Sequence, residues 1–115
     1  MFVNYTNHPS AHWTPEQTAA ALALGAPILD CPFPQVPPDW DEAQVAALAL
    51  EQVQKLAALR PDAVLCQGEF TLVYLVVQGL KALGIPVLAA CSARDSKQEG
   101  NQIISTFRFV RFRLY

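Results

Sequence analysis

Apolar and polar residues along the chain form eight segments of alternating type, which most of the nine prolines and five glycines separate. Four short apolar runs predict β-strands over residues 2–6, 27–34, 63–66 and 87–91. Apolar residues at helical spacing predict three helices over residues 15–24, 42–60 and 70–83. Residues 103–115 alternate between apolar and polar positions, which predicts a long final strand, antiparallel to its neighbour.

Capping residues mark two of the helix starts. Thr14 precedes Pro15, whose missing N–H costs nothing in the first turn, and Gly25 follows the last helical residue. Asp41 and Glu42 repeat this logic before the longest and most amphipathic helix.

The order strand, helix, strand, helix, strand, helix, strand, strand predicts one α/β domain that spans residues 1–115. We expect a minimal Rossmann-like fold, a three-layer sandwich with a mainly parallel sheet and a C-terminal antiparallel strand. The polar stretch 95–102 contains Glu99-Gly100-Asn101 and predicts a hairpin turn or a flexible loop after a strand that ends at residues 92–94.

The third predicted helix, residues 70–83, has apolar residues on nearly every side, so one sheet face cannot cover all of them. We therefore expect a homodimer in which a second subunit covers helix 70–83.

Charge is unevenly distributed along a chain whose net charge is -2. Residues 1–69 carry eight acids and two bases, whereas residues 70–115 carry six bases and two acids. The low net charge argues against a protein that binds long nucleic acid, and the basic C-terminal part favours a small anion as the partner. The last strand contains Arg108, Arg111 and Arg113, and strict alternation does not let all three face one way.

Cys31, Cys66 and Cys91 are too far apart for a CxxC motif and are interpreted as buried thiols in a reducing compartment. No signal peptide pattern and no apolar run long enough to span a membrane is present, so we expect a cytoplasmic protein without membrane contacts. The phosphate-binding motifs GxGxxG and GxxxxGK[ST] are absent, and no cofactor is predicted. His8 and His12 have no third ligand nearby, so a metal site is not expected.

Ligands of open α/β sheets bind beyond the carboxyl ends of the strands, where helix N-termini offer N–H donors to anions. This rule selects three loops, after the first, third and fourth predicted strands. Their candidate ligand-binding residues are Asn7, Ser10, Gln67, Gly68, Thr71, Ser92 and Arg94. The alternatives are structural: a strand-to-helix turn around Gly68, a solvated Arg94, and Glu69 complementing the helix dipole.

His8 and Glu69 are the candidate proton acceptors. The unperturbed pKa of histidine, about 6.5, suits a general base, but a loop histidine that bonds to backbone is the alternative. No Ser-His-Asp arrangement or pair of catalytic carboxylates is evident in the sequence.

The chain resembles small stand-alone CRISPR-associated proteins with a CARF-like Rossmann fold. The similarity covers FVNYTNHPS at 2–10 with Trp13, VLCQGEFT at 64–71, VLAACSAR at 87–94 and FRFVRFRLY at 107–115. It implies a type III CRISPR role as a homodimeric ring nuclease, which binds cyclic oligoadenylate, most simply cyclic tetra-adenylate, and cleaves it to end signalling. The implied cleavage is metal-independent attack of a ribose 2′-oxygen on the adjacent phosphate.

Two other functions fit the same residues. The protein would be a non-catalytic sensor or sponge for cyclic oligoadenylate if no acid-base pair exists. It would be a small dimeric interaction subunit if no nucleotide binds at all.

Overall fold

A computed structural model describes residues 1–115 and contains five strands and three α-helices in the predicted order. The strands are β1 (Phe2–Tyr5), β2 (Ile28–Asp30), β3 (Ala63–Cys66), β4 (Val87–Glu99) and β5 (Gln102–Leu114). The α-helices are α1 (Pro15–Leu24), α2 (Glu42–Ala58) and α3 (Phe70–Ala82), and a short 3₁₀ turn covers Ser10–His12.

The helix starts follow the predicted caps. The Thr14 side chain accepts a hydrogen bond from the Gln17 N–H at the start of α1. Asp41 and Gln44 form a complete capping box at the start of α2, in which each side chain bonds to the other residue's backbone N–H. These bonds satisfy backbone donors that the first helical turn leaves unpaired.

The five strands form one sheet in the order β2-β1-β3-β4-β5, with β1 to β4 parallel and β5 antiparallel to β4. This is one of the two common doubly wound orders, in which the connections progress in opposite directions from β1 and from β3, so the strand order reverses between these two parallel strands. The α/β fold with a C-terminal antiparallel pair is therefore confirmed.

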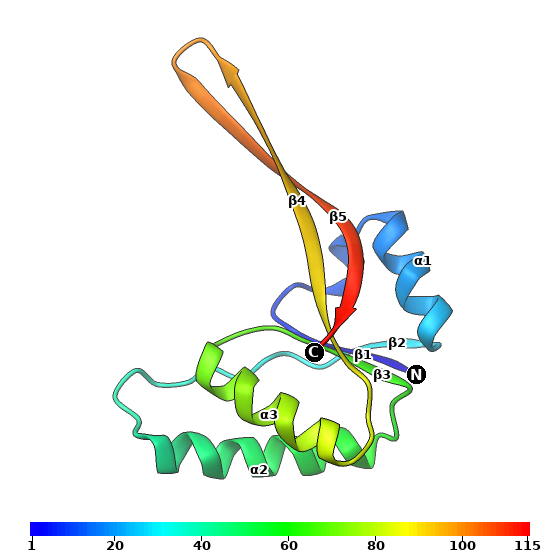
Figure 1. Cartoon of the computed structure of the whole chain (residues 1–115), viewed down its shortest axis with the longest axis vertical. Coiled ribbons are helices and arrows are strands. Elements are labelled where there is room, and N and C mark those ends of the chain that lie inside the picture. Colours follow the sequence, from blue (N-terminus) through cyan, green and yellow to red (C-terminus); the bar gives the residue numbers. More distant parts are fainter.

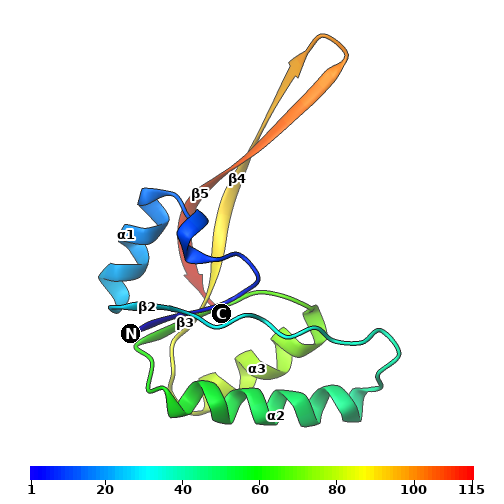
Figure 2. The ribbon, with the colours of Figure 1, turned by 180° about the vertical axis from the view of Figure 1, so that it is seen from behind.

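Helices cover both faces of the sheet (Figures 1 and 2). α1 lies against a cluster of six buried residues on one face: Phe2, Ala21, Ala63, Leu65, Leu88 and Phe112. α2 and α3 cover the opposite face, where fifteen buried residues, among them Val3, Leu56 and Leu72, form the larger part of the core. These three layers are the expected Rossmann-like sandwich.

β4 and β5 extend beyond the sheet as a long twisted two-stranded hairpin (Figure 1). The expected end of the fourth strand near residues 92–94 is wrong, because β4 continues to Glu99 and only Gly100 and Asn101 form the turn. Gly100 adopts a φ of 61°, which a tight hairpin turn favours and a glycine adopts without strain. Cross-strand hydrogen bonds stabilise these polar residues as strand, although their sequence lacks a strand pattern of its own.

A register shift between Cys91 and Ser92 changes which side chains share a face of this hairpin. Arg113, Arg111 and Arg108 pair with Ala89, Cys91 and Ala93, which are alternate residues of β4. The three arginines therefore lie on one face, and the expectation that they cannot is wrong. The reason is that Val110 is the extra, unpaired residue of a β-bulge, so strict alternation stops there.

α3 is buried by the sheet and by α2 together. Leu72, Val76, Val77 and Leu80 are buried within this chain, while Phe70 and Tyr74 are exposed. The close approach of the helices is possible at Gly79, where a Cβ atom would lie 2.7 Å from a methyl carbon of Val53. Part of the apolar surface that the sequence assigned to a second subunit is thus covered by α2.

None of the helices combines the length and the hydropathy that crossing a membrane requires.

Candidate ligand-binding site

A pocket of about 210 Å³ lies at the carboxyl ends of β1 and β3, where the strand order reverses. Eight residues line it: Thr6, His8, Trp13, Gln17, Leu65, Gln67, Ala90 and Ser92. Three of the predicted site residues, His8, Gln67 and Ser92, therefore meet in one pocket, although His8 follows β1, Gln67 follows β3 and Ser92 lies within β4. The sheet topology brings them together, because the carboxyl ends of parallel strands share one edge.

These three side chains keep hydrogen-bonding groups that the chain does not use. Gln67 Oε1 accepts from the Ala90 N–H at 3.3 Å, while its Nε2 donates to no group in the chain. The His8 imidazole and the Ser92 hydroxyl make no hydrogen bond within the chain, and His8 is exposed. Such a pocket offers several donors and one titratable group to a ligand.

A buried polar network fixes the loop that carries His8. The Asn4 Nδ2 donates to the His8 carbonyl and to Asp30 Oδ1, both at 2.9 Å. The Thr6 hydroxyl donates to Asn4 Oδ1 and accepts from the His8 N–H. Because Asn4 and Thr6 are buried, these bonds are sheltered from water and hold the loop in one conformation.

Ser10 belongs to the same hydrogen-bond network, which fixes the loop that carries His8, and it does not line the pocket. Its hydroxyl donates to Asp30 Oδ2 at 3.1 Å, and its backbone N–H also donates to the Asp30 carboxylate. Asn7, on the same loop, is exposed and makes no side-chain hydrogen bond.

Glu69 and Thr71 are used at the start of α3. The Glu69 carboxylate accepts from the Thr71 hydroxyl at 2.6 Å and from the backbone N–H groups of Thr71 and Leu72. These bonds, the Thr71 hydroxyl foremost, lower the pKa of Glu69. An ionised, hydrogen-bonded cap is a weak proton acceptor, and Glu69 does not line the pocket that contains His8.

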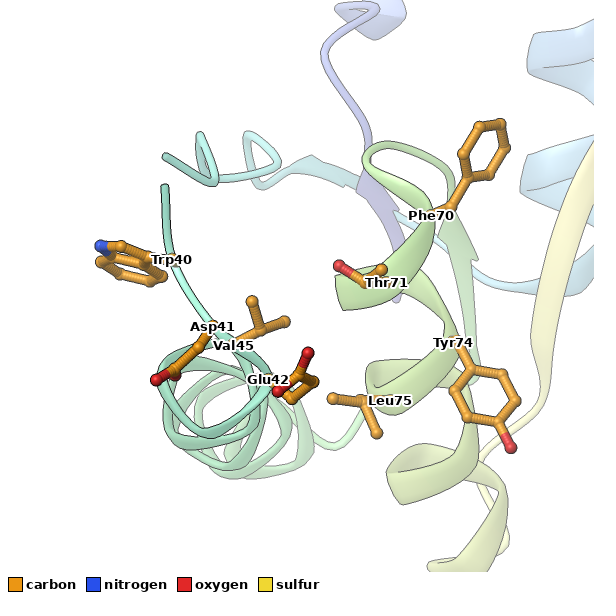
Figure 3. A pocket seen from close by; sticks show the side chains of 8 residues that line it. All are labelled: Trp40, Asp41, Glu42, Val45, Phe70, Thr71, Tyr74 and Leu75. Carbon is orange, nitrogen blue, oxygen red and sulfur yellow. The ribbon is translucent and has the colours of Figure 1, made fainter. Parts of the chain in front are cut away.

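Thr71 instead faces a larger groove of about 430 Å³ between α2 and α3. Figure 3 shows Trp40 and Val45 on the α2 side of this groove and Thr71 and Leu75 facing them from α3, while the Phe70 and Tyr74 rings extend from α3 away from α2. The groove is mostly apolar and lacks the cluster of free polar groups found in the smaller pocket. We therefore take the smaller pocket as the candidate ligand site.

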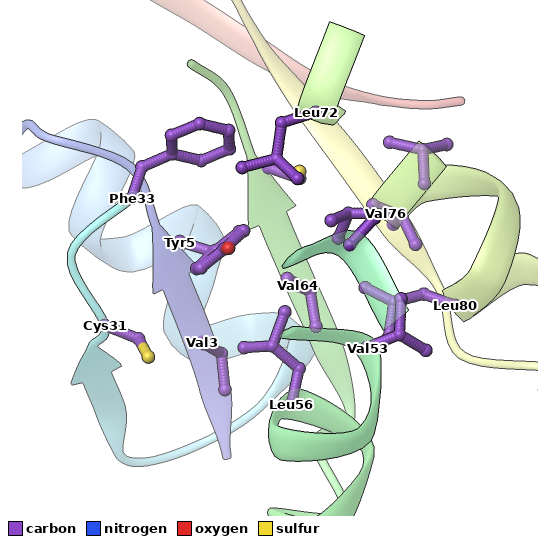
Figure 4. Close-up of a cluster of buried hydrophobic side chains, with 14 of the residues drawn as sticks. Val3, Tyr5, Cys31, Phe33, Val53, Leu56, Val64, Leu72, Val76 and Leu80 are labelled. Carbon is purple, nitrogen blue, oxygen red and sulfur yellow. The ribbon is translucent and has the colours of Figure 1, made fainter. Parts of the chain in front are cut away.

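Gly68 is explained by packing. A Cβ atom at this position would lie 2.4 Å from Cδ1 of Phe33. Phe33 is buried and packs against Tyr5 with ring centroids 5.0 Å apart (Figure 4). The space that we assigned to an approaching ligand is filled on this side by the Phe33 ring.

Arg94 lies on the projecting part of β4, opposite Phe107, rather than in a loop after a strand end. Its Nε and Nη2 donate to the Ser105 hydroxyl at 3.3 and 3.0 Å. It lies two residues beyond Ser92 on the same face of the strand, about 7 Å along it.

The cysteines are all free, and Cys31 and Cys66 are buried. Burial raises the pKa of the Cys66 thiol to about 12, so this residue is protonated at neutral pH. The Tyr115 hydroxyl donates a hydrogen bond to the backbone carbonyl of Cys66 at 2.7 Å. No three or more His, Cys, Asp or Glu side chains are grouped so that they could hold a metal ion.

The sequence did not identify four polar contributors, Thr6 and Gln17 in the lining and Asn4 and Asp30 in the hydrogen-bond network behind it, nor the apolar lining residues Leu65 and Ala90. Trp13 was noted only as part of a resemblance. A signal for Asn4 was present, since it is a polar residue inside an otherwise apolar predicted strand.

No curated protein and no solved structure matches this chain. One family profile, described as the uncharacterized protein MJ1673 family, matches residues 1–113. The chain therefore belongs to the uncharacterized MJ1673 family.

Proposed function

We propose that the pocket at the carboxyl ends of β1 and β3 binds cyclic oligoadenylate and that the protein cleaves the bound ring. The observation that carries this proposal is the meeting of His8, Gln67 and Ser92, with unused hydrogen-bonding groups, at the reversal point of a doubly wound sheet. A pocket of about 210 Å³ suits one part of a nucleotide, not a whole ring. The ring would thus be shared between two pockets of a homodimer, which we propose to form through α3.

Neutral donors would bind the phosphate. Gln67 Nε2 and the Ser92 hydroxyl can each donate to a phosphate oxygen, and no lysine or arginine lines the pocket. The half-buried Trp13 ring offers an apolar surface on which an adenine base could stack. Fixed donors of this kind stabilise charge that develops during a reaction without having to reorganise.

In the proposed reaction, a ribose 2′-oxygen attacks the adjacent phosphorus and the bond from phosphorus to the 5′-oxygen breaks. His8 accepts the proton of the 2′-hydroxyl, and the 5′-oxygen leaves as a hydroxyl after taking a proton from solvent water, to which His8 then returns its own. The products are a 2′,3′-cyclic phosphate end and a free 5′-hydroxyl end. We favour His8 over Glu69 as the proton acceptor, because His8 lines the pocket and Glu69 is bonded to the α3 N-terminus.

One observation favours a second candidate, a sensor or sponge that binds the ring without cleaving it. His8 is the only ionisable side chain of the lining, so no acid-base pair is present. In both cases we place the protein in the cytoplasm, where its three free cysteines would stay reduced.

The test is incubation of the protein, in excess EDTA, with labelled cyclic tri-, tetra- and hexa-adenylate in molar excess. Multiple-turnover conversion to linear products with 2′,3′-cyclic phosphate ends is the expected result. His8→Ala should lower the rate by about 10²- to 10⁴-fold, the usual contribution of a general base. His12→Ala is the matched control, because His12 is also an exposed loop histidine but does not line the pocket.

Binding is measured in parallel by thermal unfolding. A ring at 100 times its dissociation constant should stabilise the protein by about 2.7 kcal/mol. Stabilisation without products would establish the sensor or sponge. The absence of both with all three rings would refute the proposal and leave an interaction subunit.

A further inference from the structure

The projecting part of the β4–β5 hairpin, residues 93–108, has no packing partner within this chain. We call it the arm. It extends away from the three layers in both views (Figures 1 and 2), and the last side chains that join the core below it are Phe109 and Phe112. A two-stranded hairpin that packs against nothing is only marginally stable in water. The arm therefore needs a surface that covers it.

Only one of the two faces of the arm is suited to such a contact. The charged face carries Asp95, Lys97, Glu99 and Arg108, and its charges pair with each other, Lys97 with Glu99 and Arg108 with Asp95. The other face carries Ile103 and Phe107, which are 73% and 71% exposed. Arg94 shares that face and forms no ion pair within the chain.

The groove between α2 and α3 has the complementary properties. Phe70 and Tyr74 line it from the α3 side and are 88% and 62% exposed. Their rings lie along the rim of the groove, on the side of α3 turned away from α2, where they face water (Figure 3). Asp41 and Glu42 lie on its α2 side and form no ion pair within the chain. The groove thus offers aromatic surface beside two carboxylates that have no charged partner, and the arm offers apolar side chains beside a guanidinium that has none.

We propose that the arm of one copy packs into the α2–α3 groove of a second copy, and that the exchange is reciprocal. The second copy is the occupant because both complementary surfaces belong to the same chain and neither is used within it. Reciprocal exchange makes one face of the arm and the eight groove residues of each copy contribute to the interface, so each dimer has two such contacts.

The exchange does not depend on cyclic oligoadenylate. It goes beyond the proposed function by naming the surface that covers α3. It also places a partner beside the ligand pocket, since the contact face of the arm continues from Ser92 to Arg94 along β4.

The test measures the dimer dissociation constant by sedimentation at micromolar concentrations, without ligand. Phe107→Ser alters the arm and Tyr74→Ser alters the groove, and both side chains are exposed in the single chain, so neither change should prevent folding. Each variant damages both contacts of its own dimer. If one aromatic truncation weakens one contact about tenfold, each variant dimer should be about 100-fold weaker than the wild type.

The decisive measurement mixes the two variants. A mixed dimer has one contact between an intact arm and an intact groove, and its other contact lacks both aromatic side chains. Because the exchange packs Phe107 against Tyr74, the second truncation removes no further interaction there, so the mixed dimer should be about tenfold stronger than either variant dimer. Leu22→Ser, which removes an exposed leucine of α1 outside both surfaces, is the matched control and should dimerise as the wild type does.

Four results would overturn the exchange. A monomeric wild type would remove its basis. Loss of the dimer with Phe107→Ser alone would mean that two arms pair with each other, and loss with Tyr74→Ser alone would mean that two α3 faces do. If both variants weaken the dimer but mixing does not strengthen it, the contacts are not reciprocal. None of these results bears on ring binding, which is measured separately on the same proteins.

Discussion

Replacement of Gly68 by alanine tests whether the turn after β3 is built for packing or for a ligand. The added Cβ would lie 2.4 to 2.6 Å from three carbons of the Phe33 ring. Ordinary contact begins near 3.4 Å, so the ring must move by about 1 Å. Phe33 is 4% exposed and packs on Tyr5, which leaves it little room to move.

Overpacking of a well-filled core costs about 1 to 3 kcal/mol, and we expect Gly68→Ala to lower the free energy of unfolding by that amount. For a domain of this size each kcal/mol corresponds to a change of about 4 °C in Tm. Urea unfolding followed by tryptophan fluorescence measures the difference.

The control uses the same substitution without the ring. In a Phe33→Ala background the three close carbons are absent, so Gly68→Ala should cost less than about 0.5 kcal/mol, which makes the two changes strongly non-additive. An equal cost in both backgrounds would refute the packing explanation. A fully stable Gly68→Ala protein that no longer binds cyclic oligoadenylate would also refute it, because that result would show that the glycine serves a ligand.

Three further predictions concern the site and its surroundings. Asp30→Ala should lower stability by about 1 to 3 kcal/mol, measured by urea unfolding, because a buried Asn4 donor and two Ser10 donors lose their acceptor. Glu69→Gln should destabilise α3 at pH 7. Since the folded pKa of Glu69 is lowered, this stabilisation is complete above the unfolded value of 4.5 and is lost as the pH falls through the folded pKa, so wild type and variant should converge in acid. In the folded protein Ellman's reagent should modify the half-buried Cys91 first and Cys66 only after unfolding, because Cys66 is buried and its pKa is about 12. Rapid modification of two or three thiols in the folded protein would contradict that prediction.

Local signals predicted the helices well because their causes are local. The caps at Thr14 and Asp41 act within three or four residues, so the sequence shows them directly. The strands β1 and β3 were predicted because each is a short apolar run, which is typical of a strand buried on both faces.

The features that the sequence did not predict depend on partners far along the chain. Phe33 and Gly68 meet across 35 positions, and nothing near either residue indicates the other. The extent of β4 depends on β5, whose hydrogen bonds hold a polar segment as strand. Candidate residues for the site were found by the rule that parallel strands end at one edge, but their side-chain partners, such as Asp30 for Ser10, became evident only in three dimensions.

The bulge at Val110 determines which side chains of β5 lie on the same face of the hairpin. If Val110 took part in regular alternation, Arg108 would lie on the side of Phe112, and Phe107 would lie with Arg111 on the opposite side. Because Val110 stays outside the pairing, the aromatic side chains lie on one side and the arginines on the other. Deletion of Val110 should therefore keep the side chains of both faces in place and merely straighten the two-stranded ribbon. Deletion of Phe109 shortens β5 by the same one residue, but it also removes a side chain that packs against the core. Tolerance to loss of a single residue therefore depends on which position is lost.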